Sequence, residues 1–404
     1  MSISLTPQTR TIVKACIPAL EAHGVDITRE MYRRLLSDEN IRDLFNISHQ
    51  KNGDQPRALA YAVLAYARHI DDPTALKGMI ERIAEKHVGL NILPEHYPHV
   101  GTALLGAIAH VLGEQATPEI MEAWKEAYGF LADVLINRER QIYEDHAARK
   151  GGWTGWRAFR IADRHEETAD TVSFILQPVD GQPVMQHQPG QYLSFRLDIP
   201  GHGPERRNYS ISSAPADDHY RITVRKQEDG VVSRWFHDDV RTGDTLDVSA
   251  PAGDFFLQSS SERPLCFISA GAGITPVMSM MEALTTRTSH PAIHFIHGTQ
   301  TADNEIFARK THGLAACGAI TADLFYSQMN SLPQRTDGLN CHTGRLTPSW
   351  LKAHKDRQAD FYICGPTEFM VSMIHTLREQ DIPMDRIHYE MFGSASTPYL
   401  VTQA

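Results

Sequence analysis

The segment Arg207-Asn208-Tyr209-Ser210, near the middle of this 404-residue chain, decides the fold. It follows Pro189-Gly190 and the apolar-aromatic run that begins at Tyr192, which together predict a turn and then a strand. A guanidinium can bridge a pyrophosphate, and a tyrosine ring can lie along a flat conjugated ring. Taken alone, the segment is better explained as the exposed end of an ordinary strand. Its meaning depends on what precedes and follows it.

The residues around this segment predict a small antiparallel β-barrel. Short alternating runs are separated by Gly, Pro and Asp turns, and they are Phe159–Ile161, Val172–Leu176, Tyr192–Leu197, Tyr220–Val224 and Leu246–Val248. Within the barrel, Gly230 precedes Val232 and Ser233 and a predicted helix. A glycine turn that opens a helix presents free N–H groups to a phosphate. A plain loop-to-helix start explains this turn more simply when it is considered alone.

From Pro264 the pattern alternates between strand and helix, which predicts a doubly wound parallel α/β sheet. The predicted strands are Leu265–Ser269, Ala292–His297, Ile320–Tyr326, Phe361–Cys364 and Ile387–Glu390. Two strands end in a turn that opens a helix, the context in which backbone amides cradle a pyrophosphate. These turns are Gly271-Ala272-Gly273-Ile274-Thr275-Pro276 and Cys364-Gly365-Pro366.

This order of motifs resembles the ferredoxin reductase family, in which a flavin barrel precedes a nicotinamide domain. The resemblance implies that FAD binds to Tyr192, Arg207, Asn208, Tyr209, Ser210, Val232 and Ser233, and that NAD(P)H binds at the two glycine turns. The segment Tyr389-Glu390-Met391-Phe392-Gly393 is similar to the family segment whose aromatic ring covers the flavin. The resemblance implies that Phe392 is that ring and that Glu390 assists hydride or proton handling. The family usually continues with proline, whereas this chain has Ser394.

Residues 1 to about 148 show helical periodicity without a convincing strand. The first predicted helix runs from Thr6-Pro7 to Gly24, and later helices begin near Ile27, Gln55-Pro56, Ile80, Pro94 and Thr117-Pro118. Polar residues stand at Tyr32, His87 and Glu139, where the helical period places apolar ones. Singly, these are explained as a core tyrosine, one satisfied histidine among 21, and a surface carboxylate. Together they suggest a site, because a buried carboxylate needs a partner and an imidazole provides one.

The helical region resembles the globin domain of flavohemoglobins. The matching residues are Leu44-Phe45-Asn46, Asn52-Gly53-Asp54-Gln55, Lys86-His87, Tyr97 and Asn137-Arg138-Glu139. The resemblance implies haem b with His87 as the iron ligand, Lys86 directly before it, and Tyr97 and Glu139 behind it. It also implies that Phe45 packs on the haem plane and that Tyr32, Gln55 and Leu59 surround the oxygen site.

The chemistry of these residue types agrees with that implication. A carboxylate that accepts the second imidazole proton makes the histidine more imidazolate-like, which favours activating dioxygen over storing it. The Tyr32 hydroxyl and the Gln55 amide can donate to a bound oxygen that carries partial negative charge. Pro56, directly after Gln55, can shift how that amide faces the haem.

Composition limits the other classes of function. The net charge of -10 and the lack of a basic run argue against nucleic-acid binding. The 5 cysteines contain no C-x-x-C pair and fit reduced thiols. We recognise no signal peptide and no apolar stretch of the ~20 residues that span a membrane. A cytoplasmic monomer without an integral membrane segment is expected, and a lipid or azole-type ligand is a further candidate occupant of the distal pocket.

The resemblance to flavohemoglobins covers essentially the whole chain. It implies a globin domain at 1–148, a linker at 149–153, an FAD barrel at 154–259 and an NAD(P) domain at 260–404. The implied activity is that of a nitric oxide dioxygenase, in which electrons pass from NAD(P)H through FAD to haem and nitric oxide is oxidised to nitrate. The lack of an arginine shortly after Ile293–His297 favours NADH over NADPH. Three alternatives remain: an oxygen or nitric oxide sensor or carrier, a flavin reductase for an outside acceptor, and a peroxide reductase.

Overall fold

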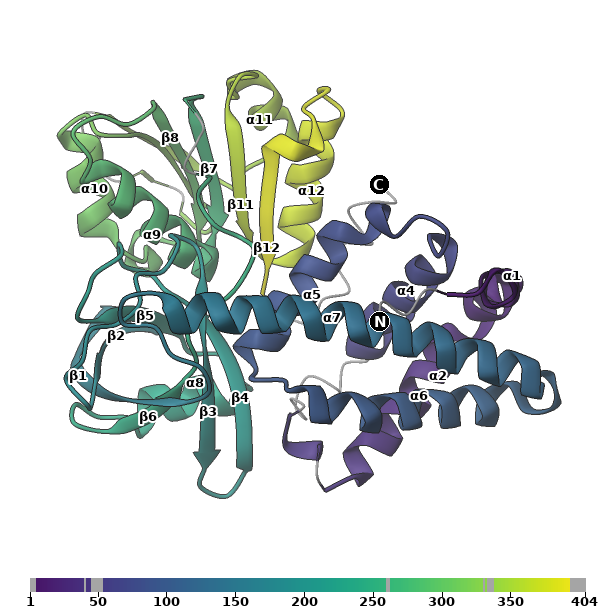
Figure 1. Ribbon diagram of the computed structural model, residues 1–404. Helices are drawn as coiled ribbons and strands as arrows, with labels where there is room; N and C mark the ends of the chain where they lie inside the picture. Colours follow the sequence, from purple (N-terminus) through teal and green to yellow (C-terminus); the bar gives the residue numbers. More distant parts are fainter. Residues whose placement is uncertain are drawn as a thin grey trace.

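The computed structural model describes residues 5–39, 41–44, 54–258, 262–329, 331–332 and 338–392. In the view of Figure 1 the two sheets lie one below the other, and the helices of the first third gather on one side of them. The long helix α7 (Pro118–Ala148) runs from the far end of the helical region to the barrel. This arrangement confirms the predicted fold class of an all-helical region, an antiparallel barrel and a parallel α/β sheet.

The other described helices of the first third are α1 (Pro7–Ala15), α2 (Ile17–Ser37), α4 (Asp54–Arg68), α5 (Lys77–Gly89) and α6 (Tyr97–Leu112). Short 3₁₀ turns lie between them at Arg42–Leu44, Pro73–Leu76, Pro94–His96 and Gly113–Gln115. The side chains of Thr6 and Thr117 accept hydrogen bonds from backbone N–H groups at the starts of α1 and α7, and a proline follows each threonine. These are the N-caps that the sequence predicts.

One predicted helix boundary is wrong. The helix that starts at Pro7 ends at Ala15, and α2 runs through Gly24 instead of beginning after it. A Cβ atom added to Gly24 would lie 3.5 Å from the Cβ atom of Ala60 in α4. The glycine therefore allows α2 and α4 to approach closely, and this packing outweighs its weak helix propensity.

The barrel consists of β1 (Arg157–Thr168), β2 (Thr171–Pro178), β3 (Tyr192–Ile199), β4 (Gly203–Ser210), β5 (Tyr220–Arg225) and β6 (Thr245–Val248). Its strand order is β4-β3-β6-β1-β2-β5, and all pairs are antiparallel. Helix α8 (Val231–Asp238) begins after Gly230, as predicted. The sequence predicted only the end of β4, at Arg207–Ser210; the start of the strand at Gly203 was missed, because this edge strand is largely polar.

The second sheet is parallel, with the order β10-β9-β8-β7-β11-β12. Its strands are β7 (Leu265–Ala270), β8 (Ile293–Thr299), β9 (Thr321–Tyr326), β10 (Leu339–Thr343), β11 (Asp360–Gly365) and β12 (Ile387–Met391). The short edge strand β10 was not predicted. Helices α9 (Ile274–Thr285) and α10 (Ala308–Ala316) cover one face, and α11 (Pro348–His354) and α12 (Thr367–Arg378) cover the other. Among the described helices, none has the length and apolar character needed to cross a bilayer.

Candidate functional site

One large cavity, of about 2270 Å³, extends from the helical region to the ends of β7, β11 and β12. Its lining combines residues that lie far apart in the sequence. The predicted site residues that line it are Tyr32, Gln55, Leu59, Lys86, His87, Tyr97, Tyr192, Arg207, Asn208, Tyr209, Ser210, Val232, Ser233, Gly271, Ala272, Gly273, Thr275, Gly365, Pro366, Glu390, Met391 and Phe392. The fold therefore brings the candidate site residues of the helical region, the barrel and the parallel sheet to one cavity.

Several predicted residues stand outside this lining. Glu139 lies behind His87, and Ile274, Pro276 and Cys364 are buried members of the two glycine turns. Phe45, Gly393 and Ser394 lie outside the described residues.

His87 near the end of α5 is held from behind by two side chains. Its Nδ1 atom lies 2.7 Å from Oε1 of Glu139 in α7 and 3.0 Å from the hydroxyl of Tyr97 in α6. The Tyr97 hydroxyl donates to the same Glu139 oxygen at 2.5 Å. Glu139 is only 2% exposed, so its carboxylate is satisfied by these neighbours and not by water. With Nδ1 directed at an acceptor, the Nε2 lone pair of His87 is available to a ligand in the cavity.

The helical part of the cavity is also lined by Tyr32, Gln55 and Leu59. Burial raises the pKa of Tyr32 to about 12, so its hydroxyl keeps its proton as a donor. The Gln55 Oε1 atom is buried and has no hydrogen-bond partner among the described residues. Because the oxygen and nitrogen of an amide exchange by a simple flip, Gln55 can present either a donor or an acceptor to the cavity.

The barrel contributes a wall of aromatic and polar residues, of which Tyr192 and Ser210 are buried, Arg207 and Tyr209 are partly buried and Asn208 is exposed. Tyr192 is 7% exposed, and Tyr209 packs edge-on against Phe236 of α8, with ring centroids 5.2 Å apart. The Ser194 hydroxyl donates to Oδ1 of Asn208 at 2.8 Å, which fixes the orientation of that amide. One guanidinium nitrogen of Arg207 donates to Glu205 at 2.8 Å. The wall thus combines flat rings with a cation and amide groups.

The two glycine turns of the parallel sheet touch each other, because their strands β7 and β11 are neighbours. Gly271 has a φ of 53°, a left-handed conformation that favours glycine. A Cβ atom on Gly273 would lie 2.2 Å from the carbonyl oxygen of Cys364. Only glycine fits there without displacing backbone. Both turns open helices, α9 and α12, so their N–H groups lie at helix N-termini.

The contacts between α5 and the two sheets were missed from the sequence. Gly253 N–H donates to Oε2 of Glu85 at 3.0 Å, and Arg82 pairs with Asp254 at 3.2 Å. Burial raises the pKa of Glu85 to about 7. Burial also raises the pKa of Glu390 to about 8; Asp254 acts in the same direction, whereas Arg82 and Lys86 oppose it.

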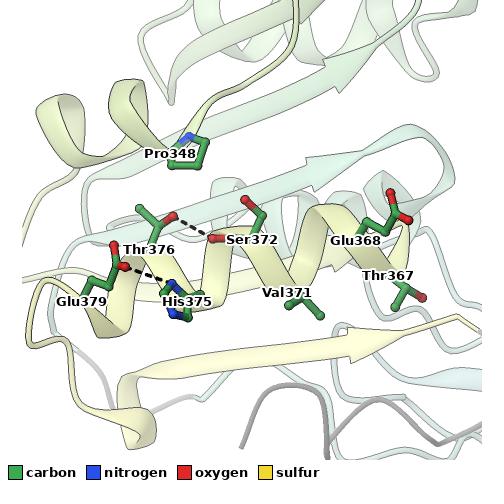
Figure 2. Close-up of a pocket in the computed structure, with 8 residues that line it drawn as sticks. All are labelled: Pro348, Thr367, Glu368, Val371, Ser372, His375, Thr376 and Glu379. Atoms are coloured by element: carbon green, nitrogen blue, oxygen red, sulfur yellow. Dashed lines mark hydrogen bonds and ion pairs between the residues drawn. The ribbon is translucent and has the colours of Figure 1, made fainter. Parts of the chain in front are cut away.

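A smaller groove of about 480 Å³ lies along α12, outside this large cavity. Figure 2 shows Val371, His375 and Glu379 on one side of the helix, below Pro348 of the neighbouring α11. The imidazole of His375 lies 3.2 Å from the Glu379 carboxylate, one helical turn away. The predicted site residues do not line this groove, so we place the functional site in the large cavity.

Comparisons with known proteins agree with this organisation. Three family models match in order: globin at residues 29–135, oxidoreductase FAD-binding domain at 158–257 and oxidoreductase NAD-binding domain at 267–375. The fold and the site thus define a globin joined to a flavin- and nicotinamide-binding oxidoreductase.

Curated relatives extend over nearly the whole chain. A flavohemoprotein of Xylella fastidiosa is 45% identical over 397 residues, which cover 97% of this chain and 98% of the relative. A flavohemoprotein of Deinococcus radiodurans is 44% identical over 405 residues, with 97% and 98% coverage. The chain belongs to the flavohemoprotein family.

Solved structures agree with that assignment. A flavohemoglobin from Malassezia yamatoensis with bound FAD and haem has a TM-score of 0.85 at 27% identity, covering 96% of this chain and 100% of that one. The FAD/NAD-binding domain of a nitric oxide dioxygenase from Vibrio cholerae has a TM-score of 0.52 at 33% identity, covering 59% of this chain and 98% of that one.

Proposed function

We propose that this chain is a nitric oxide dioxygenase that uses NAD(P)H, FAD and haem b to convert nitric oxide and dioxygen to nitrate. The observation that carries the proposal is the single cavity, which is lined by His87, the Arg207–Ser210 segment and both glycine turns. A carrier of oxygen needs only the first of these features. A converter of hydride into single electrons for a haem needs all of them.

The residues of the helical region fit a haem. His87 has its Nδ1 atom engaged by Glu139, which leaves Nε2 for iron, and Gln55 has a buried amide oxygen that awaits a partner. When bound, the haem supplies the iron that activates dioxygen. Glu139 holds the imidazole orientation and increases its electron donation, and Tyr97 fixes the carboxylate. Tyr32 and Gln55 donate to a partly negative oxygen atom, and Leu59 limits the space to small ligands.

The barrel and the parallel sheet fit the two dinucleotides. We propose that Tyr192, Tyr209 and Phe392 flank the flavin ring, that Arg207 and Ser210 bind its phosphates and ribityl chain, and that the first turn of α8 at Val232 and Ser233 adds N–H donors. The turns at Gly271 and Gly365 bind the nicotinamide cofactor. The remaining assignments, at Lys86, Phe45, Ile274, Pro276, Cys364, Gly393 and Ser394, stay predictions, as do the domain limits 1–148, 149–153, 154–259 and 260–404.

Further properties belong to the same proposal. No arginine closely follows strand β8 in the sequence, which supports NADH as the preferred hydride donor. The net charge of -10 supports a protein that does not bind nucleic acid. We propose a cytoplasmic monomer whose distal pocket also accepts a lipid or azole-type ligand.

The test is an anaerobic absorption spectrum before and after NADH, followed by nitric oxide consumption in the presence of dioxygen. We expect the flavin band to bleach, the haem band to shift to its ferrous position and nitric oxide to disappear rapidly. Rapid haem reduction with slow nitric oxide turnover would favour a sensor or carrier. Flavin bleaching without haem reduction would favour a reductase for an outside acceptor. Turnover with peroxide that exceeds turnover with nitric oxide would favour a peroxide reductase.

The metal-ligand assignment has its own variant. His87→Ala is expected to abolish stable haem binding and leave FAD bound, which absorption spectra of the purified variant measure. An unchanged haem spectrum would overturn the assignment.

A further inference from the structure

The helix that carries His87 docks on the barrel with a different face. Arg82, Glu85 and Gly89 are spaced at i, i+3 and i+7 in α5, so they lie along one stripe of the helix. Glu85 accepts a hydrogen bond from the N–H of Gly253. A Cβ atom on Gly89 would lie 3.1 Å from the Ser194 hydroxyl oxygen and 3.3 Å from Ala252 and Tyr192 side-chain atoms. The haem-ligand helix and the proposed flavin wall are therefore in direct contact.

Arg82 extends this contact to the parallel sheet. Its Nε atom donates to Oδ2 of Asp254 at 3.2 Å, and its guanidinium carbon lies 5.7 Å from the ring centroid of Tyr389 in β12. The side chain is 39% exposed, and it lines the shared cavity. One guanidinium thus joins the helical region, the barrel and the parallel sheet.

Tyr389 connects Arg82 to the nicotinamide side of the site. It is the residue before Glu390 and lies three positions before Phe392, and both of those residues line the cavity. A displacement at the end of β12 therefore alters the ring beneath Arg82. Single exposed ion pairs and cation–π contacts are individually weak. Such a contact can be broken and remade in each catalytic cycle.

We propose that Arg82 is a positioning residue that couples the end of β12 to α5. Electrons then pass from flavin to haem only when the helical region, the barrel and the parallel sheet are correctly placed relative to one another. This inference rests on the proposed electron path and assigns no step of chemistry to Arg82 itself. It requires that loss of the guanidinium slows flavin-to-haem transfer more than it slows hydride transfer to the flavin.

A matched control exists within the barrel. Arg196 also pairs with an aspartate, Asp247, at 2.7 Å, and lies 5.4 Å from the ring centroid of an aromatic residue, Trp156. Its contacts join parts of the barrel only. Arg196→Ala therefore removes the same kinds of interaction without removing a direct contact to α5 or β12.

The experiment compares the parent protein with Arg82→Ala, Arg82→Lys and Arg196→Ala as holoproteins. Anaerobic stopped-flow mixing with NADH follows flavin bleaching and haem reduction at separate wavelengths. For Arg82→Ala we expect haem reduction to slow by about tenfold and flavin bleaching to slow much less; a misplacement of about 1 Å can cost about a hundredfold, so a tenfold loss corresponds to a smaller shift. Arg82→Lys should recover part of the rate, and Arg196→Ala should match the parent protein. Equal slowing of both steps, or an unchanged haem step, would overturn the inference.

A second readout needs no turnover. Amide hydrogen exchange of the full chain without NADH should be faster at Gly253 and along β12 in Arg82→Ala than in Arg196→Ala. Equal exchange rates in the two variants would show that the contacts of Arg82 with Asp254 and Tyr389 do not stabilise this junction. If Arg82→Ala fails to fold, the pair Arg82→Asp with Asp254→Arg should restore the haem step that each single change impairs. A parent protein whose haem is not reduced would contradict the proposed electron path, whereas the exchange measurement would still test Arg82.

Discussion

Replacing Glu139 with glutamine tests how the buried carboxylate supports the proposed iron ligand. In the parent protein one oxygen, Oε1, lies 2.7 Å from Nδ1 of His87 and accepts the hydrogen bond of Tyr97. Glutamine keeps the shape and an acceptor oxygen but removes the charge. A hydrogen bond to a charged group contributes about 1.5–3 kcal/mol, whereas a neutral one contributes about 1 kcal/mol. The change therefore costs about 0.5–2 kcal/mol at the His87 contact.

We expect haem to leave Glu139→Gln about tenfold faster than the parent protein, since about 1.4 kcal/mol corresponds to a factor of ten. Changes next to a metal ligand typically cost about 10–100-fold in affinity, which agrees with this figure. The assay follows haem transfer to an excess of an apoglobin acceptor by absorption, with FAD content measured in parallel.

Glu81→Gln is the matched control for this prediction. Glu81 lies in α5 and pairs with Arg138 of α7, so this carboxylate joins the same two helices without contacting His87. Its haem loss should equal that of the parent protein. Equal haem loss from Glu139→Gln would refute the reasoning, because the carboxylate would then be only a structural link.

Other predictions follow from the same cavity. Tyr32→Phe should release dioxygen about fivefold faster in stopped-flow measurements, because a hydrogen-bond donor worth about 1 kcal/mol is lost. Tyr143→Phe is the control and should release dioxygen at the parent rate, because the Tyr143 hydroxyl donates to a backbone carbonyl. Gly273→Ala should raise the KM for NADH and cost about 1–3 kcal/mol of stability through overpacking. Gly298→Ala is the control, because its Cβ atom would meet its nearest neighbour at 3.8 Å. An unchanged KM for Gly273→Ala would contradict the prediction. The Glu390 carboxyl has an ordinary pKa of 4.5 that rises to about 8 on folding, so the folded state holds the extra proton and stability falls as pH rises through this window. In urea unfolding, the free energy of unfolding of Glu390→Gln should fall less with rising pH than that of the parent protein. An identical dependence on pH in both proteins would show that Glu390 is ionised in the folded state.

The individual motifs were predictable because each satisfies a local requirement. His87 and Glu139 occupy apolar-face positions on their helices, and a buried carboxylate requires a partner. The glycine turns stand between a strand and a helix, which is visible in the sequence. The start of the edge strand β4 and the whole of the edge strand β10 were missed because the alternation of apolar residues is weak in strands with few neighbours. The continuation of α2 through Gly24 was missed because it depends on packing against α4.

The contacts of Arg82 could not be predicted for a different reason. A charged stripe at Arg82, Glu85 and Lys86 has the pattern of a solvent-exposed helix face, and its partners Asp254 and Tyr389 lie more than 160 residues away in the sequence. Pairing between domains leaves no periodic signal in one sequence. The one local signal was Gly89 within the same stripe, since a glycine at a helix end also permits the close approach of another backbone.

On the proposed assignments, helix α5 has two functions, and the helical period places them on two faces. His87 shares one face with Ile80 and Ile83, whereas Arg82, Glu85 and Gly89 form the other. With a rise of about 1.5 Å per residue and continuous backbone hydrogen bonds, the helix moves as a short rigid rod. A shift of the barrel contacts consequently moves the imidazole as well. If His87 binds the haem as proposed, this mechanical link lets Arg82 influence electron delivery by positioning α5.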